Sequence, residues 1–371
     1  MTMGGIRTDV VIIGGGPAGL AAAIAARRKG LSVTVADGMR PPIDKACGEG
    51  LMPDSLRVLG QLGVPVSEAL GHPFRGIRFL HGDVNVESSF PTGAGIGVRR
   101  KVMHQLLVTC AEDAGVRLLW GTPITVVDGK PMAVGGESVR ARWIVGADGA
   151  ASRVRIWARL DDHDRQSIRY GFRRHYRVAP WTDCMELYWG TGCQIYVTPV
   201  GSQEVCIALI SRDPHLRLDA ALPRFPFLLD RLGGAPPTSA ERSAVSASRR
   251  LRSVVRGNVA LIGDASGSVD AITGEGLCLA FHQALCLAEA LGREDLSSYA
   301  SAHQRLMRRP AFMADFLLLI DRFPALRARA LLTLAAKPHL FSRLLAMHVG
   351  ALAPPRFAAT AIALGWSVLS A

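Results

Sequence analysis

The chain has 371 residues, 49% of them apolar, which is long enough for two domains with apolar cores. Its seven cysteines form no CxxC pair, so we expect neither a disulfide scaffold nor a zinc or other metal site. We expect the protein to reside in a reducing cytoplasm. The formal net charge is +12, but aromatic residues are sparse and no nucleic-acid-binding module is legible, which excludes nucleic acid as the expected partner.

The segment 9–37 contains the parts of a dinucleotide site. Its β-branched run Val10 to Ile13 predicts a buried parallel strand, and the pattern Gly14-x-Gly16-x-x-Gly19 follows directly. Gly14 permits a sharp turn, Gly16 lets the backbone approach a pyrophosphate, and Gly19 lets helix and strand pack closely. A strand-to-helix turn without a ligand remains the alternative interpretation of this pattern.

The residues around this loop favour the nucleotide. Pro17 and Ala18 fall in the first turn of the following helix, whose free N–H groups attract phosphate. A second strand, Ser32 to Ala36, ends in Asp37, 18 residues after Gly19. A carboxylate at this position accepts hydrogen bonds from an adenosine ribose. The strand, the helix, the second strand and the acid therefore follow one another at the spacing that a dinucleotide site needs.

A second strand-end motif lies in the middle of the chain. The segment "WIVGADGAASRVR" at 143–155 predicts a buried strand, a turn at Asp148-Gly149 and a helix that starts near Ser152. Acid–glycine pairs at strand ends are common turns, so this motif alone does not identify a ligand.

A third motif lies in "GNVALIGDASGSVDAITGEGLCLAFHQA" at 257–284. The strand predicted at 259–262 ends in Gly263-Asp264, and Gly274 and Gly276 open a helix after a loop of small residues. The two acid–glycine motifs, at these separations from the first loop, indicate one composite site.

Together the three motifs resemble the flavoprotein monooxygenase and geranylgeranyl reductase family, which builds one FAD site from GxGxxG, DG and GD elements. The resemblance covers roughly residues 8 to 290. It implies an α/β fold with a Rossmann-type FAD-binding domain, a β-sheet substrate domain and a C-terminal helical tail. The corresponding ranges are 1–73 with 98–160 and 255–300, then 74–97 with 161–254, and finally 301–371.

The resemblance assigns the cofactor-binding residues one by one. They are Gly14, Gly16, Pro17, Ala18, Gly19, Asp37, Arg100, Asp148, Gly149, Gly263, Asp264, Gly274 and Gly276. Arg100 matches the family's arginine beside the FAD phosphates, and Asp264 matches the acid near the ribityl chain. The helix after Gly276 would stabilise the negative charge of reduced flavin with its N-terminus. Because Asp270-Ala271 replaces the family's frequent Asp-Pro, we expect a slightly different loop there.

Residues 47–50 have the Cys-Gly-x-Gly pattern that is typical of the geranylgeranyl reductase branch, where this loop lies near the isoalloxazine. Cys47 is a candidate nucleophile or redox thiol, or simply a small residue in a crowded loop. No His or Lys is placed by the sequence to activate it. Glu49 either binds substrate or caps the following helix.

Alternating residues predict strands in 74–90 and 166–211, the sheet that roofs the substrate cavity in the family. Trp189 and Tyr196 are the candidates for the substrate cavity, although aromatic side chains on strands more often belong to the ordinary core. The region 214–247 has a weaker secondary-structure pattern, and we expect it to return toward the FAD domain.

The C-terminal region combines basic and apolar residues. Residues 301–371 contain nine Lys or Arg against two Asp, a net charge of +7, and helices are predicted with breaks at Pro324, Pro338 and Pro354-Pro355. The uncharged run 357–371 is shorter than the about 20 residues that span a bilayer. It either covers the FAD domain or makes a peripheral contact with the inner face of a membrane.

Three functions are compatible with this sequence. We favour an FAD-dependent monooxygenase that hydroxylates a lipophilic aromatic or polyketide-like substrate through a flavin hydroperoxide. The CGxG loop favours an alternative, a reductase of isoprenoid double bonds, and a non-catalytic flavin-binding, membrane-associated protein is a third possibility. A halogenase is disfavoured because the WxWxIP motif is absent from the sequence. With no second GxGxxG, NAD(P)H would bind transiently, or a separate electron-donor protein would reduce the flavin.

Overall fold

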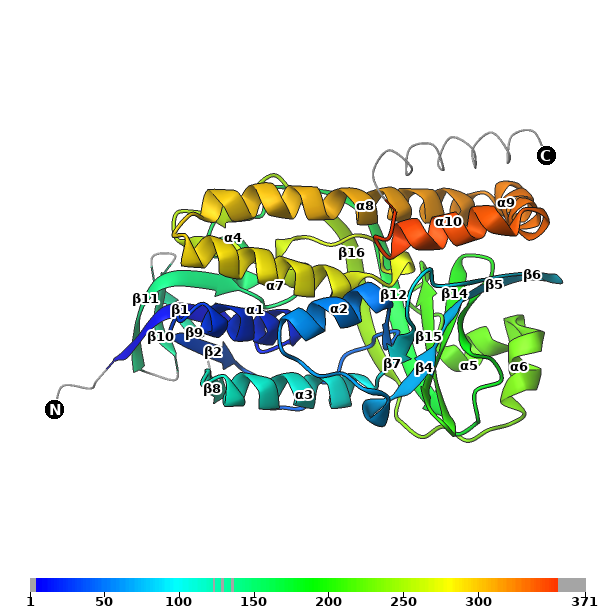
Figure 1. Cartoon of the computed structure of the whole chain (residues 1–371), viewed down its shortest axis with the longest axis horizontal. Helices are drawn as coiled ribbons and strands as arrows, with labels where there is room; N and C mark the ends of the chain where they lie inside the picture. The colour runs from blue at the N-terminus through cyan, green and yellow to red at the C-terminus, as the bar shows by residue number, and fades with distance from the viewer. Residues whose placement is uncertain (1–4, 123, 128–129, 135–136, 353–371) are drawn as a thin grey trace.

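The structure, a computed structural model, describes residues 5–122, 124–127, 130–134 and 137–352. Figure 1 shows a nucleotide-fold half that contains α1, α3 and α7, and a second half built on another sheet. Helix α8 (Leu296–Arg322) runs along the top of the nucleotide-fold half toward the second. The predicted combination of a Rossmann-type domain, a second sheet and C-terminal helices is confirmed.

The first sheet is the parallel sheet of a nucleotide-binding fold. Its main path has the order β17-β18-β11-β1-β2-β8, and β9 and β10 form a hairpin attached to β11. The bounds are β1 (Ile6–Ile13), β2 (Val33–Asp37), β8 (Arg117–Trp120), β9 (Ile124–Val127), β10 (Lys130–Val134), β11 (Glu137–Gly146), β17 (Val255–Arg256) and β18 (Val259–Leu261). Because β1, β2, β11 and β18 run parallel, the loops that follow them meet at one edge of the sheet.

Helices cover this sheet through small and apolar side chains. Alanines at 21–23, 25 and 26 are buried in α1 (Pro17–Arg28), which packs against α3 (Arg100–Asp113) and α7 (Gly276–Gly292). Alanine is the strongest helix former and allows close approach of neighbouring helices. The remaining helices of this half are α2 (Pro53–Gln61) and the short α4 (Arg153–Trp157).

The second sheet has seven strands in the order β16-β12-β15-β14-β13-β5-β6. The bounds are β5 (Gly76–His81), β6 (Val84–Ser89), β12 (His163–Tyr176), β13 (Cys184–Trp189), β14 (Cys193–Gly201), β15 (Glu204–Ser211) and β16 (Arg242–Leu251). Neighbours pair antiparallel except β13 with β5. A small sheet of β3 (Gly50–Leu51), β7 (Gly95–Gly97) and β4 (His72–Phe74) lies against β14.

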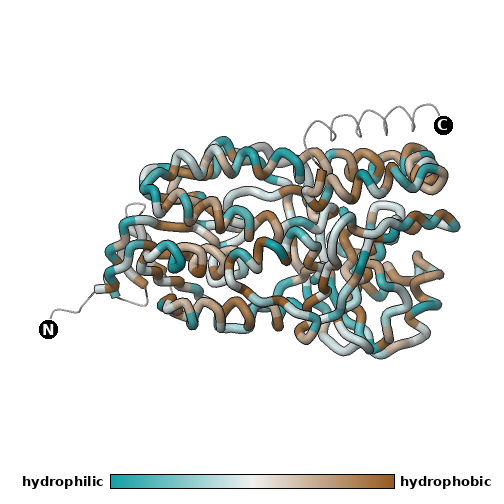
Figure 2. The backbone as a smooth tube through the Cα atoms, viewed as in Figure 1, coloured by the Kyte–Doolittle hydropathy of each residue, from teal (hydrophilic) through white to brown (hydrophobic). Residues whose placement is uncertain are grey.

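Successive side chains of each strand point to opposite faces of the second sheet, and both faces carry clusters of apolar side chains. Tyr188 and Ile195 pack with α5 (Leu218–Ala221) and α6 (Pro226–Leu232) on one face. Leu187 and Tyr196 lie in the cluster of the other face, toward α8, α9 (Pro324–Ala336) and α10 (Pro338–His348). In Figure 2 the chain of these C-terminal helices alternates between hydrophobic and hydrophilic patches, as amphipathic helices do.

Two of the three predicted helix breaks fall within the described residues, and both are present. α9 begins at Pro324 and α10 at Pro338, whereas Pro310 lies inside α8, which also runs unbroken through residue 300. Short 3-10 turns complete the described elements: η1 (Glu68–Leu70), η2 (Leu222–Arg224), η3 (Gly263–Ser266) and η4 (Ala271–Thr273). The break at 354–355 and the uncharged run 357–371 lie outside the described residues. Among the helices described, none combines the length and apolar composition needed to cross a bilayer.

Candidate active site

The glycine loop after β1 opens onto a cavity of about 730 Å³. Gly14, Gly16, Pro17 and Ala18 line it, and α1 begins at Pro17 with its N-terminus toward the cavity. Gly14 has a φ of 113° and lies so close to the Ala147 carbonyl that a Cβ would be 2.3 Å from that oxygen. The loop therefore needs glycine for its backbone conformation as well as for its shape.

Gly19 has a different role from the glycines before it. A Cβ at Gly19 would lie 1.9 Å from the Gly14 carbonyl oxygen, and Gly19 is not among the residues that line the cavity. Its lack of a side chain lets α1 pack onto the turn, as its place in the sequence pattern suggested.

Asp37 joins two loops at the rim of the cavity. Its carboxylate accepts hydrogen bonds from the backbone N–H groups of Gly15 and Met39, each at 2.7 Å. Asp37 itself lines the cavity at the end of β2. The structure thus places an acid where the sequence predicts the ribose contact, already oriented by backbone donors.

The middle motif closes the same cavity from β11. Asp148 accepts hydrogen bonds from the N–H groups of Arg153 at 2.7 Å and Val154 at 3.2 Å, which anchors the start of α4. Gly149, with a φ of 80°, lines the cavity, and Ser152 is the N-cap that the sequence predicted.

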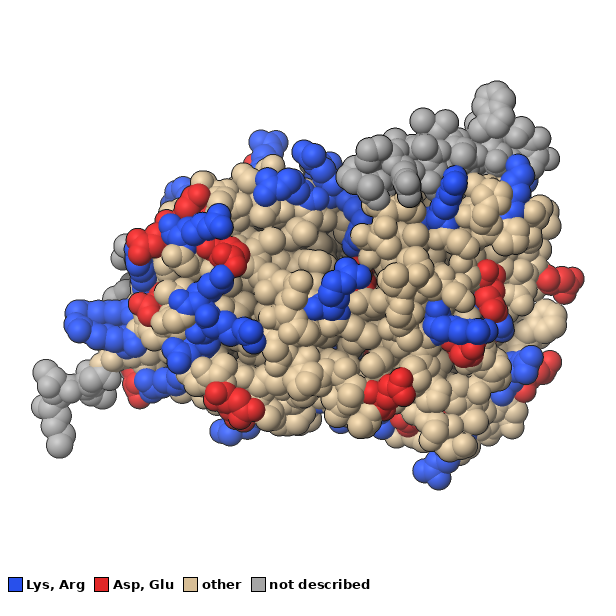
Figure 3. Space-filling view, viewed as in Figure 1, with Lys and Arg blue, Asp and Glu red and all other residues tan. Residues whose placement is uncertain are grey.

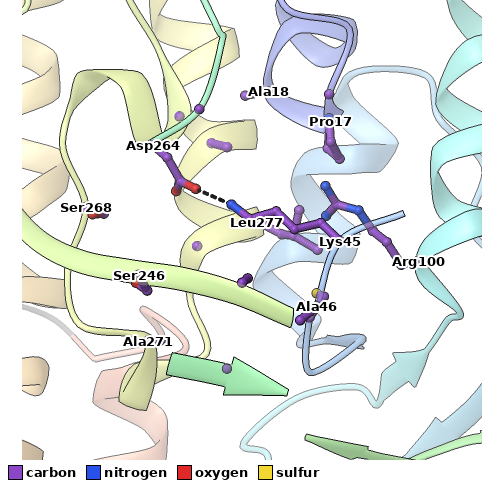
Figure 4. A pocket seen from close by; sticks show the side chains of 18 of the residues that line it. Pro17, Ala18, Lys45, Ala46, Arg100, Ser246, Asp264, Ser268, Ala271 and Leu277 are labelled. Atoms are coloured by element: carbon purple, nitrogen blue, oxygen red, sulfur yellow. Dashed lines mark hydrogen bonds and ion pairs between the residues drawn. The ribbon is translucent and has the colours of Figure 1, made fainter. Parts of the chain in front are cut away.

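The late motif contributes a charged pair. Asp264 lies 3.1 Å from the Lys45 ammonium group, and Figure 4 shows this pair together with Arg100 and Pro17 around the cavity. Gly263 precedes Asp264 and donates its backbone N–H to the Gln283 side chain of α7 at 2.8 Å. Lys45 was not singled out from the sequence, and it adds a cation beside the predicted acid.

Asp270 and Ala271 lie where the short turn η4 begins. Asp270 caps η4 by accepting from the Ile272 N–H at 3.0 Å, and its other oxygen lies 3.3 Å from Arg169 Nε. Gly274 and Gly276 then line the cavity at the N-terminus of α7.

Glu275 connects this end of the cavity to the C-terminal helices. The residue is buried, with a carboxylate oxygen 3.3 Å from Arg309 of α8 and the other 3.6 Å from His348 of α10. Burial raises the pKa of Glu275, while His348 and Arg309 oppose that shift. The loop before α7 and the C-terminal helices are therefore linked through the buried Glu275 carboxylate.

The open space along these glycines fits a dinucleotide. A Cβ built at six of the lining glycines would meet no atom within 4 Å: Gly16, Gly38, Gly48, Gly149, Gly274 and Gly276. The N-termini of α1 and α7 both face this space and offer backbone N–H groups to anionic groups. The lining residues therefore fit FAD, whose pyrophosphate the N-terminus of α1 would hold.

The other end of the cavity is apolar and lies under the second sheet. Its apolar lining residues include Met52, Met185, Tyr196, Ala208 and Ile210, and the buried Arg169 and Arg173 also line the cavity. The Tyr196 hydroxyl donates to the Ile272 carbonyl at 2.5 Å, and burial raises the pKa of this phenol. Tyr196 is thus placed in the cavity wall with its polar atom satisfied.

The placement of Trp189 corrects the sequence prediction. Trp189 is 3% exposed, does not line the cavity and lies in the apolar cluster beneath α9, with the Arg327 guanidinium 6.0 Å from its ring. It shares a sheet face with Tyr196, but the C-terminal helices cover it.

The Cys-Gly-x-Gly loop lines the cavity and carries a buried acid. Cys47 Sγ lies 3.4 Å from the Glu49 N–H, and Glu49 is 2% exposed. The Glu49 carboxylate accepts from the Arg100 N–H at 2.9 Å and contacts His175 Nε2 at 2.7 Å. It therefore does not cap the following helix, which begins at Pro53 without a side-chain cap.

Three residues of β12 were missed from the sequence: Arg169, Arg173 and His175. All three are buried and have the same parity along the strand. With Gly171 between Arg169 and Arg173, the three residues fall on one face of the strand, and this shared parity was the available signal.

Comparison with known proteins supports FAD as the cofactor. Residues 7–186 match the model of the FAD binding domain. The chain is 32% identical over 320 residues to a menaquinone reductase of Mycobacterium tuberculosis (strain ATCC 25618 / H37Rv), which covers 78% of each chain. It is 30% identical over 380 residues to a menaquinone reductase of Mycolicibacterium smegmatis, covering 89% of this chain and 91% of that one.

The chain is also similar to a monooxygenase and to a solved structure of a flavoprotein. A 6-methylpretetramide 4-monooxygenase of Streptomyces rimosus is 28% identical, with 82% of this chain and 81% of that one covered. A flavoprotein/dehydrogenase structure from Cytophaga hutchinsonii superposes with a TM-score of 0.80 at 15% identity, covering 93% of both chains.

Fold and site define a flavoprotein with an FAD-binding domain. The chain belongs to the family of FAD-dependent oxidoreductases that includes monooxygenases and geranylgeranyl-type reductases.

Proposed function

We propose that the protein is an FAD-dependent reductase that saturates a C=C bond in the isoprenoid chain of a lipid, with a prenylated quinone as the first candidate. The sequence alone favoured hydroxylation, and the relatives favour the alternative. Those at 32% and 30% identity are named menaquinone reductases, and a third at 26% is a digeranylgeranylglycerophospholipid reductase of Methanococcoides burtonii. All three names combine a reductase with a molecule that carries isoprenoid chains.

The apolar end of the cavity is the structural observation that carries this proposal. Met52, Met185 and Ile210 present hydrocarbon and thioether surface, and methionine adapts its shape to flexible apolar ligands. Such a lining suits an alkyl or alkenyl chain, which offers no hydrogen-bonding groups. When bound and reduced, FAD supplies the hydride for the reduction.

The chain's own residues would then hold and isolate the reactants. The N-termini of α1 and α7, with Lys45 and Arg100, would hold the anionic cofactor, and the second sheet would keep water from the double bond. NAD(P)H or a separate electron-donor protein remains the predicted source of electrons.

Product analysis tests this proposal. Purified protein with FAD, reduced anaerobically, would be incubated with menaquinone, and the lipid extracted, reoxidised in air and analysed by mass spectrometry. A gain of two mass units that survives reoxidation indicates a saturated chain, because a quinol formed at the ring would lose its hydrogens in air. A gain of one oxygen atom, seen only when the incubation contains oxygen, would instead support the monooxygenase.

We further propose that the surface of α8 and α9 contacts an anionic membrane. Leu319, Phe323 and Leu332 are 47%, 47% and 56% exposed, and the exposed basic residues Arg322 and Arg329 lie on the same helices. Figure 3 shows Lys and Arg along this upper edge of the molecule. Basic side chains near anionic lipid each contribute about 1 kcal/mol, and apolar side chains insert beside them.

Vesicle co-sedimentation tests the membrane contact. Binding to phosphatidylserine-containing vesicles should fall when Leu319, Phe323 and Leu332 are all changed to Ser, and when salt is raised. The matched control changes Phe227 and Leu229, which are 57% and 43% exposed on α6 of the opposite sheet face, to Ser. Equal binding of both variants and wild type would contradict the proposed surface.

A further inference from the structure

A second cavity, of about 200 Å³, lies behind the wall of the cofactor cavity. Its lining includes Ser239, Ala240 and Arg242 from the segment before and at the start of β16, together with Lys101. Lys101, Ala240 and Arg242 are exposed, so this cavity opens to solvent. Among the described residues, Glu49, Arg100 and Arg173 line both cavities.

Glu49 is the one of these three that can release and regain a proton, because arginine keeps its protons at all relevant pH values. It also adopts a φ of 61° between two glycines. A non-glycine residue in this left-handed region costs about 1 kcal/mol or more, and glycine would remove that cost. A carboxylate at a position suited to glycine points to a use for the acid itself.

A hydrogen-bonded chain leads from Glu49 to the second cavity. His175 Nε2 lies 2.7 Å from Glu49 Oε2, and His175 Nδ1 lies 2.8 Å from the Ser239 hydroxyl. Glu49 and His175 are both buried, whereas Ser239 is partly exposed in the second cavity. Each step of this chain is within the distance of an ordinary hydrogen bond.

The surrounding charges set the direction of these hydrogen bonds. Guanidinium nitrogens of Arg99 and Arg173 each lie 3.3 Å from His175 Nδ1. Arginine only donates, so Nδ1 is an acceptor, and the ring hydrogen is on Nε2, directed at Glu49. This assignment follows from the hydrogen-bond network.

Arg173 Nε also lies 3.6 Å from Glu49 Oε1, and other charged groups surround the chain. Asp44 pairs with Arg173 and with Arg242, and Glu204 lies 3.5 Å from Arg99. The Cys206 thiol lies beside Glu49 and His175, and burial, with Glu49 nearby, raises its pKa well above the ordinary value. Arg99 and Arg173 on this cluster disfavour a metal cation, so a protonic function is the better use of these donors.

We propose that Ser239, His175 and Glu49 form a proton relay from the solvent-filled second cavity to the cofactor cavity. The relay rests on the proposed reduction. Saturating a C=C bond requires a hydride, which the reduced cofactor supplies as it is oxidised, and a proton for the other carbon. The hydrogen on His175 Nε2 passes to the Glu49 carboxylate, which delivers it to the substrate carbon, while His175 Nδ1 accepts a proton from Ser239 and Ser239 takes one from water. One solvent proton is consumed for each double bond.

The first test measures the relay without turnover. In FAD-loaded protein labelled with 15N-histidine, the His175 signals are identified by their loss in His175→Gln. We expect hydrogen on Nε2 and none on Nδ1, and slower exchange of this hydrogen with water in Ser239→Ala. Thr238→Val is the matched control, because Thr238 lines the same cavity but donates its hydroxyl to Glu204 at 2.5 Å. Equal exchange in wild type and Ser239→Ala overturns the relay.

The second test uses turnover and chemical rescue. Loss of a positioned general acid costs about 100-fold or more in rate, so Glu49→Gln should slow double-bond reduction by that factor with FAD content unchanged. Glu49→Gly suits the backbone at this position and leaves space for a small acid, so added formate should restore activity to this variant. If Glu49 had only a structural role, formate would not restore activity to Glu49→Gly, and that result would contradict the relay. If wild type fails to reduce any isoprenoid lipid, the proposed function fails, and the exchange measurement still decides the relay.

Discussion

Gly16 and Gly19 belong to one sequence motif, but the structure predicts opposite consequences when each is changed to alanine. Gly16 has a φ of −72° and a ψ of 177°, which alanine adopts without strain, and its Cβ would enter open space in the cavity. Replacing a glycine at such a position stabilises a protein by about 0.4–1 kcal/mol through the unfolded chain. Gly16→Ala should therefore leave the protein without FAD equally or slightly more stable.

Its binding of FAD should nevertheless weaken. The methyl group would occupy the space through which a pyrophosphate approaches the N-terminus of α1. Loss of one charge-assisted hydrogen bond costs about 1.5–3 kcal/mol, which corresponds to a roughly 10- to 150-fold weaker affinity.

Gly19→Ala should damage the fold instead. Its Cβ would lie 1.9 Å from the Gly14 carbonyl oxygen, where contacts below 3.0 Å do not occur, so α1 must move by more than an ångström. Overpacking of this kind lowers the free energy of unfolding by about 1–3 kcal/mol. We expect the upper end of this range because the contacted atom is a backbone carbonyl oxygen, which cannot rotate away as a side chain can. The gain in helix propensity from alanine is only about 1 kcal/mol, so a net loss of about 2 kcal/mol remains.

Two titrations separate these effects. Urea unfolding of the FAD-free proteins measures fold stability, and quenching of flavin fluorescence measures FAD affinity. The reasoning is refuted if Gly16→Ala binds FAD as wild type does, or if Gly19→Ala without FAD is as stable as wild type.

Further predictions concern the cofactor and pH. Asp264→Ala removes the ion pair with Lys45, in which each side chain is 42% exposed, so the free energy of unfolding should change by only about 0–1 kcal/mol. A flavin titration should nevertheless show about 10- to 150-fold weaker FAD binding. Denaturing the yellow protein should release all its flavin as FAD, detected by chromatography; FMN or protein-bound flavin would contradict the assigned site. Burial lowers the pKa of His303, which contacts the Ser266 hydroxyl at 3.0 Å, from 6.5 to about 4. The unfolded chain then binds more protons between these values, so stability should fall by about 3 kcal/mol as pH falls from 6.5 to 4. In His303→Gln, urea unfolding across this range should show a flatter profile, and an unchanged profile would contradict the assignment.

The cofactor end of the site could be predicted from the sequence because its determinants are local. A turn after a parallel strand needs particular glycines and an acid at fixed spacing, and parallel pairing brings such turns to one edge. Asp37, Asp148 and Asp264 were found in this way, and each lines the same cavity.

The substrate end was harder, because alternation along a strand defines a face but not the element that covers it. Trp189 and Tyr196 share a face of the second sheet, yet α9 covers the first while the second lines the cavity. The contact of Glu49 with His175 joins residues 126 positions apart, which no local spacing specifies. Such buried pairs depend on how the two sheets pack against each other.

The measurement that tests the central claim most directly is an anaerobic single turnover with reduced, FAD-loaded protein and menaquinone. Proton NMR of the extracted and air-oxidised lipid counts its vinyl hydrogens. A reductase of the isoprenoid chain should remove one vinyl hydrogen signal for each flavin oxidised, without oxygen. Retention of every vinyl signal, with flavin oxidised only by the quinone ring or only after oxygen is admitted, would contradict the account.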